Sequence, residues 1–118
     1  MDIRHQKRTS IIQGLYAYSF VPHEDTKKID PKIQEIIKHS RKLNKAIEKY
    51  ASKFPIDKIA RVDVAILQLA IYELTIDKKE PPKVVINEAV ELAKELGSEK
   101  SYAFINAVLG KVYDEILQ

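Results

Sequence analysis

The sequence predicts an all-α protein whose helices pack around one central, buried helix. Apolar side chains recur at three- and four-residue spacing along nearly the whole chain, and no stretch alternates as a β-strand would. Prolines and a glycine fall where helices should begin or end, and one segment is apolar on almost every side. The 118 residues fit a single domain, residues 1–118, that is long enough to bury a core.

The first two predicted helices cover most of the N-terminal half. The first spans about residues 3–20 and ends near Pro22, which disfavours helix at the residue before it. The second begins at Asp30, an N-cap that Pro31 follows at the first helical position, and ends at Phe54-Pro55. Its apolar stripe consists of Ile33, Ile36, Ile37, Leu43, Ile47 and Tyr50.

The third predicted helix, residues 62–74, is the central one, because a helix that is apolar on every side is normally surrounded by other helices. Pro81-Pro82 opens the fourth helix, and Gly97 is expected to end it with a positive φ. Ser98 is expected to cap the fifth helix. The core stripe of that helix is Ile105, Leu109, Val112 and Ile116.

The composition argues against an enzyme. Cysteine is absent, so disulfides and thiolate metal sites are excluded. His5, His23 and His39 lie far apart and show no ligand spacing, so we expect neither a metal nor a cofactor. No nucleophile–base motif or glycine-rich phosphate loop is present, and the carboxylate pairs fall on helix faces expected to be solvated.

The chain has no apolar segment approaching the roughly 20 residues that span a bilayer, so no membrane partner is expected. The basic N-terminus and the apolar run that begins at Ile11 have the order of a signal peptide. Gln13 and two tyrosines interrupt that run, however, and no small-residue cleavage site follows it. A cytoplasmic protein is therefore expected.

The charge is unevenly spread along the chain. Residues 1–61 hold 14 Lys and Arg against seven acids, a net charge of +7, whereas residues 62–118 hold six Lys against ten acids, a net charge of −4. This asymmetry is typical of a protein with one anion-facing half, but solvated basic faces are also common.

The N-terminal cations form the first candidate for anion binding. Arg4, Lys7 and Arg8 fall at positions i, i+3 and i+4, so they are expected to project from one side of the same turn, and a protonated His5 would add to them. Such a cluster either contacts a phosphate backbone or is only a charged terminus that keeps the protein soluble. The spacing does not separate these two readings.

Aromatic residues offer a second feature of RNA-binding proteins, because unstacked bases are held on aromatic rings. Tyr16 and Tyr18 follow the basic turn, and Phe104 lies beside the apolar stripe of the fifth helix. An aromatic at helical spacing is more often part of the core, as Tyr18 is expected to be. Phe104 is the better stacking candidate.

A further basic stripe runs along the second predicted helix. Its members are Lys38, Arg41, Lys42, Lys45 and Lys49, all on the side opposite the apolar stripe. Lysines on the polar side of an amphipathic helix are usually just solvated, and contact with nucleic acid is the less favoured alternative.

Several segments of the chain together resemble the NusB family of transcription antitermination factors. Arg4 and Arg8 occupy basic positions ahead of Gln13-Gly14-Leu15-Tyr16, which is similar to the family's "QALY". Residues 63–74 look like the family's central helix. The most specific part is residues 82–94, PKVVINEAVELAK, followed by Gly97-Ser98-Glu99-Lys100-Ser101 and Phe104-Ile105-Asn106.

The resemblance implies an all-α, NusB-like RNA-binding domain of two packed sub-bundles. It implies binding of single-stranded boxA RNA in ribosomal RNA transcripts, together with the small-subunit ribosomal protein NusE and in antitermination complexes with RNA polymerase. By this resemblance Asp63 faces NusE, and acidic charge there suits a basic ribosomal protein. The RNA-binding residues that the resemblance implies are Arg4, Arg8, Gln13, Tyr16, Lys100, Phe104 and Asn106. His5 and Lys7, the other cations of the N-terminal turn, are predicted to bind RNA with them.

The sequence also departs from the family pattern. His5 and Gln6 stand where the family often has arginine, so fewer phosphates are neutralised, whereas Lys100 replaces a common acid. Two alternative functions remain: an accessory module like the N-terminal domain of ribosomal RNA cytosine methyltransferases, and a protein-interaction module that has lost RNA binding. The sequence leaves open whether the protein is a monomer or a homodimer.

Overall fold

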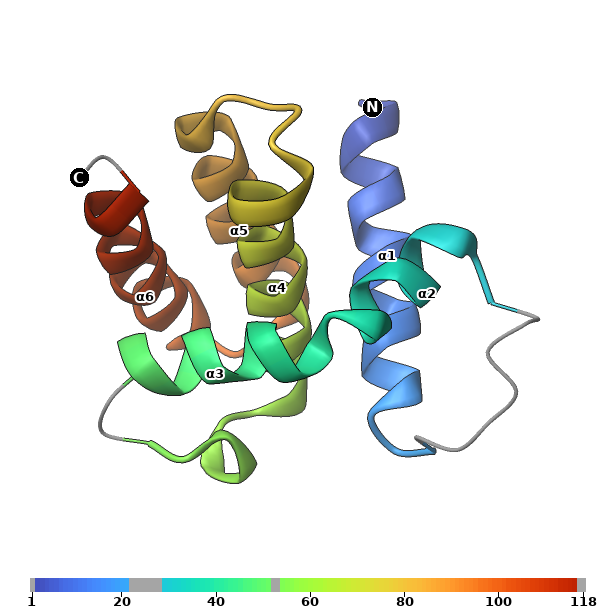
Figure 1. The fold of residues 1–118 in the computed structure, drawn as a ribbon, viewed down its shortest axis with the longest axis horizontal. Coiled ribbons are helices and arrows are strands. Elements are labelled where there is room, and N and C mark those ends of the chain that lie inside the picture. The colour runs from blue at the N-terminus through green and yellow to red at the C-terminus, as the bar shows by residue number, and fades with distance from the viewer. Residues whose placement is uncertain (1, 22–28, 52–53, 117–118) are drawn as a thin grey trace.

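The computed structural model describes residues 2–21, 29–51 and 54–116, and within these ranges it contains helices and no strand. The helices, shown in Figure 1, are α1 (Ile3–Tyr18), α2 (Pro31–Lys38), α3 (Ser40–Tyr50), the 3₁₀ helix η2 (Ile56–Lys58), α4 (Arg61–Tyr72), the π-helical turn η3 (Glu73–Asp77), α5 (Pro82–Leu96) and α6 (Ser101–Ile116). The predicted all-α class is confirmed. Pro22 and His23 lie outside the described residues.

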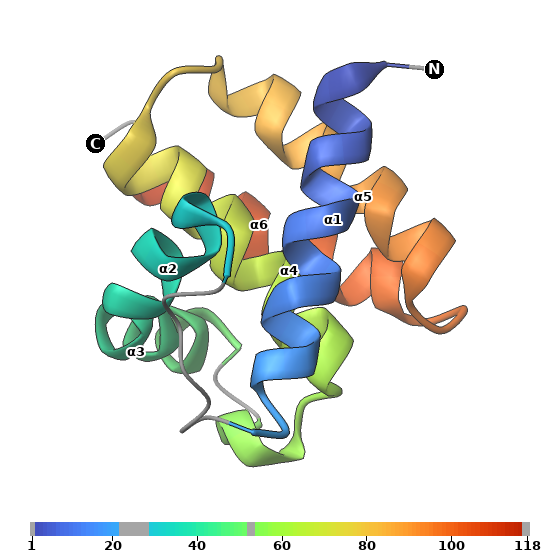
Figure 2. The same ribbon diagram turned by 90° about the vertical axis from the view of Figure 1, so that its right-hand side faces the viewer.

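Helix α4 is the central helix, as predicted from its apolar sequence. It packs against α1, α3, α5 and α6, and Figures 1 and 2 show α1 and α2 on one side of it and α5 and α6 on the other. Its buried apolar residues are Ala65, Ile66, Leu67, Leu69, Ala70, Ile71 and Tyr72. The two groups of helices share this core, which places α1 directly against the C-terminal half of the chain.

The prediction of one long second helix is wrong, because the chain bends at His39 between α2 and α3 (φ −96°, ψ 8°). The backbone N–H of His39 donates to the Ile36 carbonyl at 3.0 Å, which tightens the last turn of α2. The bend lets Ile36 and Leu43 both reach the core, where each is 1% exposed. The apolar spacing continues across the bend, so it does not reveal the break.

Helix α4 ends at Tyr72 and continues into a π-helical turn that extends past residue 74, the predicted end of the central helix. This turn, Glu73–Asp77, ends at Lys78, which is left-handed (φ 56°) and whose N–H donates to the Glu73 carbonyl at 2.9 Å. The wider turn keeps Glu73 buried on the side of α4 that faces α1. It therefore positions an acid for which the sequence predicts no role.

Gly97 ends α5 as predicted, but for a different reason. Its φ of −96° and ψ of −167° are extended values that any residue adopts, so the expected positive φ is wrong. A side chain is excluded instead by space, because a Cβ at Gly97 would lie 2.4 Å from the Ser101 Oγ. That hydroxyl accepts a hydrogen bond from the Ser98 N–H at 2.9 Å, while the Ser98 Oγ accepts one from the Lys100 N–H at 3.4 Å.

Two other predictions concern the outer ends of the helices. Ile116, expected in the core stripe of the last helix, is 40% exposed, because α6 extends beyond its neighbours at that end. The other three members of the stripe, Ile105, Leu109 and Val112, are buried as predicted. None of the helices formed by the described residues is long and apolar enough to cross a membrane.

Candidate nucleic-acid interface

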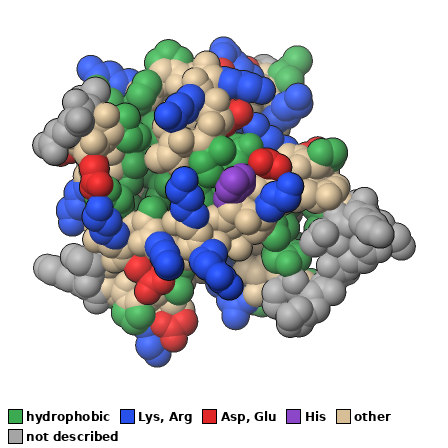
Figure 3. All heavy atoms as spheres, viewed as in Figure 1, with side chains coloured by type: hydrophobic (Ala, Val, Ile, Leu, Met, Phe, Trp, Pro, Cys, Tyr) green, Lys and Arg blue, Asp and Glu red, His purple; other side chains and the backbone are tan. Residues whose placement is uncertain are grey.

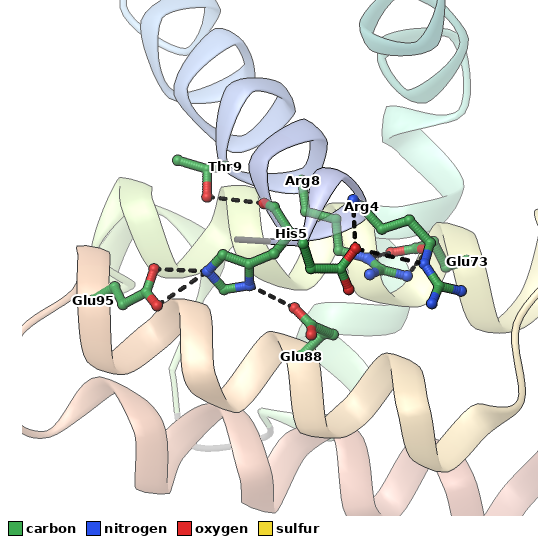
Figure 4. A network of polar contacts seen from close by, with 8 residues as sticks. Arg4, His5, Arg8, Thr9, Glu73, Glu88 and Glu95 are labelled. Atoms are coloured by element: carbon green, nitrogen blue, oxygen red, sulfur yellow. Dashed lines mark hydrogen bonds and ion pairs between the residues drawn. The ribbon is translucent and has the colours of Figure 1, made fainter.

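Positive charge lies in two separate places on the surface. Blue side chains follow α3 across the lower half of the face shown in Figure 3. The N-terminal turn of α1, which the sequence identifies as the main cationic cluster, packs instead against α5 and the segment after α4, where acids surround it (Figure 4). These surroundings decide how much of the charge is available.

Arg4 starts the cationic turn and is already paired within the chain. Its Nη1 donates to the Glu80 Oε1 at 2.9 Å, and Asp2, the N-cap of α1, lies 3.9 Å from its Nε. The hydrogen bond to Glu80 raises the pKa of Arg4. The side chain is 64% exposed, so a phosphate can still reach it, but in competition with two carboxylates.

His5 is held between two glutamates of α5. Its Nδ1 lies 2.7 Å from the Glu88 Oε2, and its Nε2 lies 2.9 Å from the Glu95 Oε2, as Figure 4 shows. Both ring nitrogens must donate to satisfy these acceptors, which requires the imidazolium form. The hydrogen bond to Glu88, followed by that to Glu95, raises the pKa of His5. One cation between two anions adds no net positive charge for RNA.

The expectation that Arg8 lies at the surface is wrong. The residue is only 8% exposed. Its guanidinium donates a bidentate pair of hydrogen bonds to the Glu73 carboxylate, from Nε to Oε2 at 3.0 Å and from Nη2 to Oε1 at 2.8 Å. The hydrogen bond to Glu73 raises the pKa of Arg8, against the opposing effect of burial. Arg8 faces α4, because it lies on the same side of α1 as the core residues Ile12 and Leu15.

Lys7 differs from its neighbours on α1. It is exposed and, within the described residues, forms no ion pair. It lines a groove of about 380 Å³ between α1, α2 and η3, where Lys32, Lys79 and several acids also lie. Of the four predicted N-terminal cations, Lys7 is therefore the one whose charge the described part of the chain leaves unpaired.

Gln13 and Tyr16 lie together on the exposed side of α1. They line a shallow hollow of about 300 Å³ with Ile12, Val62 and Leu96. The Tyr16 ring is 42% exposed and packs edge-on against Phe20 at a centroid distance of 5.0 Å. An exposed ring beside an amide side chain can stack a base and hydrogen-bond to its edge.

The predicted residues of α6 do not form one patch. Phe104 is half-buried and meets Phe54 edge-on at 6.3 Å, whereas Lys100 is exposed at the turn before α6. Asn106 is exposed and lines a different hollow, between α5 and α6. Residues two apart on a helix point in different directions, so Phe104 and Asn106 cannot face the same nucleotide.

Asp63, the predicted partner-facing acid, is buried in the isolated chain. It lies in the first turn of α4 and is 7% exposed, and its Oδ1 has no hydrogen-bond partner among the described residues. Burial raises the pKa of Asp63, and hydrogen bonding with Ser101 opposes this rise. The contact of Asp63 with NusE stays a prediction, and an unsatisfied acceptor remains at this position among the described residues.

Four acids that bind the α1 turn were not predicted from the sequence: Glu73, Glu80, Glu88 and Glu95. The sequence contains a partial indication of two of them, since Glu88 and Glu95 are seven residues apart and therefore lie on the same side of α5. No three acidic or histidine side chains of the described residues are arranged to hold a metal ion.

Comparisons with known proteins agree with this architecture. The family model described as "NusB family" matches residues 4–114. The transcription antitermination protein NusB of Roseiflexus castenholzii is 34% identical over 130 residues, an alignment that covers 94% of this chain and 92% of the relative.

Two solved structures share the fold. NusB of T. maritima superposes with a TM-score of 0.84 at 29% identity, over 97% of this chain and 92% of that one. A chain from the crystal structure of the antitermination factors NusB and NusE in complex with double-stranded RNA superposes with a TM-score of 0.75 at 22% identity, over 97% of this chain and 99% of that one. With the match over nearly its whole length, this chain belongs to the NusB family.

Proposed function

We propose that this chain is a non-enzymatic transcription antitermination factor that binds boxA-type RNA of ribosomal RNA transcripts together with the ribosomal protein NusE. Membership of the NusB family over residues 4–114 carries the proposal. A fold shared with a relative solved with NusE and RNA supports it. Because antitermination acts on nascent RNA beside RNA polymerase, the cytoplasm is the proposed site of action.

The proposed RNA contacts use the accessible members of the predicted set. Lys7 and Lys100 would neutralise phosphates, and Tyr16 and Phe104 would stack bases. The side-chain amides of Gln13 and Asn106 would hydrogen-bond to base edges. Arg4 and His5 would lie at the border of this surface. Arg8, which is buried, is proposed to position α1 through Glu73 without touching RNA.

Titration of a fluorescent boxA-type RNA tests the proposal. The full chain should bind it in a salt-sensitive manner, bind it more tightly with NusE present, and fail to bind a scrambled RNA. Loss of one stacked base costs about 1–3 kcal/mol, so Phe104→Ala should weaken binding about tenfold. Tyr113→Ala is the matched control, because Tyr113 is also half-buried and lies half a helical rotation away on α6.

Equal affinity for boxA-type and scrambled RNA would contradict the proposal. Binding of NusE without any RNA binding would instead support the protein-interaction module. Equal losses in Phe104→Ala and Tyr113→Ala would remove Phe104 from the RNA surface while leaving the function intact.

The NusE contact is proposed to involve Asp63, whose unsatisfied Oδ1 a donor from the partner would complete. Asp63→Asn keeps the shape and removes the charge, and it should weaken NusE binding about tenfold or more, since truncating one side of a buried charged contact costs about 2–5 kcal/mol. The control is Asp57→Asn, because Asp57 is exposed on η2. Unchanged NusE affinity in Asp63→Asn would move the interface elsewhere.

A further inference from the structure

The basic ridge, defined as Lys38, Arg41, Lys42 and Lys45, is the largest unexplained charged feature of the molecule. All four side chains are exposed. Figure 3 shows several Lys and Arg side chains on the face where α3 lies. The opposite side of α3 buries Leu43 and Ile47 at 1% and 0% exposure. Arg41, Lys42 and Lys45 are therefore held on a helix whose orientation is fixed by the core, and Lys38 precedes them at the end of α2.

None of the ridge cations has a carboxylate within 4 Å in the part of the chain that the structure describes. Two acids of neighbouring segments, Glu35 and Glu115, are paired with other residues. Glu35 pairs with His39 at 3.2 Å, and Glu115 pairs with Lys49 at 2.9 Å and also contacts the Tyr50 hydroxyl. Glu48 is exposed on α3 and pairs with none of the ridge residues.

The spacing of the ridge places several like charges close together. Arg41 and Lys45 are one helical turn apart at i and i+4, and Lys42 and Lys45 are at i and i+3, with about 5–6 Å between side-chain attachment points. Like charges at this spacing repel each other and destabilise the free helix. A polyanion relieves that repulsion and releases counterions, which is how Lys and Arg clusters bind nucleic-acid backbones.

The helix that carries most of the ridge is followed in the sequence by a segment that contacts the proposed stacking residue. The segment that follows α3 carries Phe54, whose ring packs edge-on against Phe104 at 6.3 Å. RNA stacked on Phe104 would therefore lie close to Phe54, in the segment that follows α3 in the sequence. The ridge residues are cations, and cations that contact RNA phosphates bind without regard to the base sequence.

We infer that the basic ridge is a second RNA surface, which binds the phosphate backbone of the single strand flanking the boxA-type element. The inference rests on the proposed function and adds to it a sequence-independent contact on α2 and α3. Its occupant is RNA, since the four exposed cations of the ridge offer point charges for phosphates.

The test uses the full chain and two RNAs. The short RNA is the boxA-type element alone, and the long RNA carries a single-stranded flank of unrelated sequence that exceeds the 37 Å length of the molecule. Affinities are measured by fluorescence anisotropy over a series of salt concentrations. The ridge variant is Lys42→Gln/Lys45→Gln. The matched control, Lys58→Gln/Lys83→Gln, removes the same charge from exposed, unpaired lysines on η2 and α5.

The inference predicts that wild type binds the long RNA more tightly than the short one. On the long RNA, the ridge variant should flatten the plot of log K against log salt by about 1.4 units, at about 0.7 per lost phosphate contact. The control variant should retain most of the wild-type slope. On the short RNA, both variants should match wild type.

Three outcomes would overturn the inference. These are equal slopes for the ridge and control variants on the long RNA, no gain from the flank in wild type, and ridge-dependent binding of polyglutamate without ridge-dependent binding of RNA. If wild type fails to bind even the short RNA, the proposed function itself is wrong and the inference falls with it. Tight binding of the short RNA with no effect of the flank rejects the inference alone.

Discussion

The N-terminal turn of α1 and the basic ridge of α3 contain similar cations in opposite circumstances. On α1, Arg4, His5 and Arg8 each meet at least one glutamate from a distant part of the chain. On the ridge, four cations face solvent with no ion pair among the described residues. The difference teaches that counting basic residues measures charge but not its availability to a ligand.

The α1 turn is best understood as a structural clamp. Its ion pairs join residues 65 to 90 positions apart and fasten the N-terminal helix to the segments after α4 and to α5. The ridge makes no comparable link, so evolution or design could alter it without loosening the fold. Four predictions follow from this contrast, beginning with the largest effect.

Arg8→Ala should destabilise the protein by about 3–5 kcal/mol, because it leaves the Glu73 carboxylate buried without its partner. Urea unfolding followed by circular dichroism measures the change. The double variant Arg8→Met/Glu73→Leu should recover most of the loss, since replacing both buried charges with apolar groups is often neutral. An Arg8→Ala variant as stable as wild type would show that Arg8 does not fasten α1 to the rest of the fold, and would contradict the contrast between the α1 turn and the ridge.

His5→Gln should lower stability by about 1 kcal/mol at slightly acidic pH, because it removes a charged donor that bridges two glutamates. The pKa of His5 is raised in the folded state. Its stabilisation is therefore fully present below the unfolded pKa of about 6.5 and is lost as the pH rises through the folded value. The free energy of unfolding should decline with pH across this window more steeply in wild type than in His5→Gln.

The control for the pH experiment is His39→Gln, since His39 has a single acidic partner, Glu35, on its own side of the molecule. This variant should keep the steep decline of the wild type. If wild type and His5→Gln show parallel pH profiles, the imidazolium bridge between α1 and α5 does not contribute to folding.

Arg4→Gln should leave the free energy of unfolding unchanged within error. The Arg4–Glu80 pair is exposed on the Arg4 side (64%), and exposed ion pairs contribute little to stability. Chemical denaturation at low and high salt would check this. A loss comparable to that of Arg8→Ala would mean that the whole turn acts as one coupled network.

The ridge variant Lys42→Gln/Lys45→Gln should show a small effect of the opposite sign, a gain of stability of at most about 0.5 kcal/mol at low salt, because it removes repulsion between neighbouring cations. The gain should vanish in high salt, where such repulsion is screened. Thermal unfolding in both conditions sharpens the comparison. A clear loss of stability would reveal that the ridge, like the α1 turn, is tied into the fold.

Helical periodicity correctly predicted where helices lie in the chain, but it did not predict where they bend or change to another helix type. The apolar segment at residues 62–74 did become the central helix, and Pro31 and Pro82 each begin a helix. The bend at His39 escaped prediction because the apolar spacing continues through it. The π turn escaped because α-helical and π-helical backbones bury similar residue patterns over so short a segment.

The candidate site was less predictable than the fold. Gln13, Tyr16 and Lys100 are exposed and stay predicted RNA contacts, whereas Arg8 and Asp63 are buried. Spacing along a helix places residues relative to one another, but it does not determine which side of the helix the neighbours cover. That depends on the angle at which α1 and α4 pack.

The sequence by itself determined that this protein is all-helical, which segment lies at its centre, and to which family its motifs belong. These properties follow from local spacing and from residue types at fixed offsets. Only the tertiary structure decided which cations remain free, because the glutamates that pair with Arg4, His5 and Arg8 are each at least 65 residues away in the sequence. Ion pairing depends on distances of a few ångströms, and such distances exist only once the helices have packed.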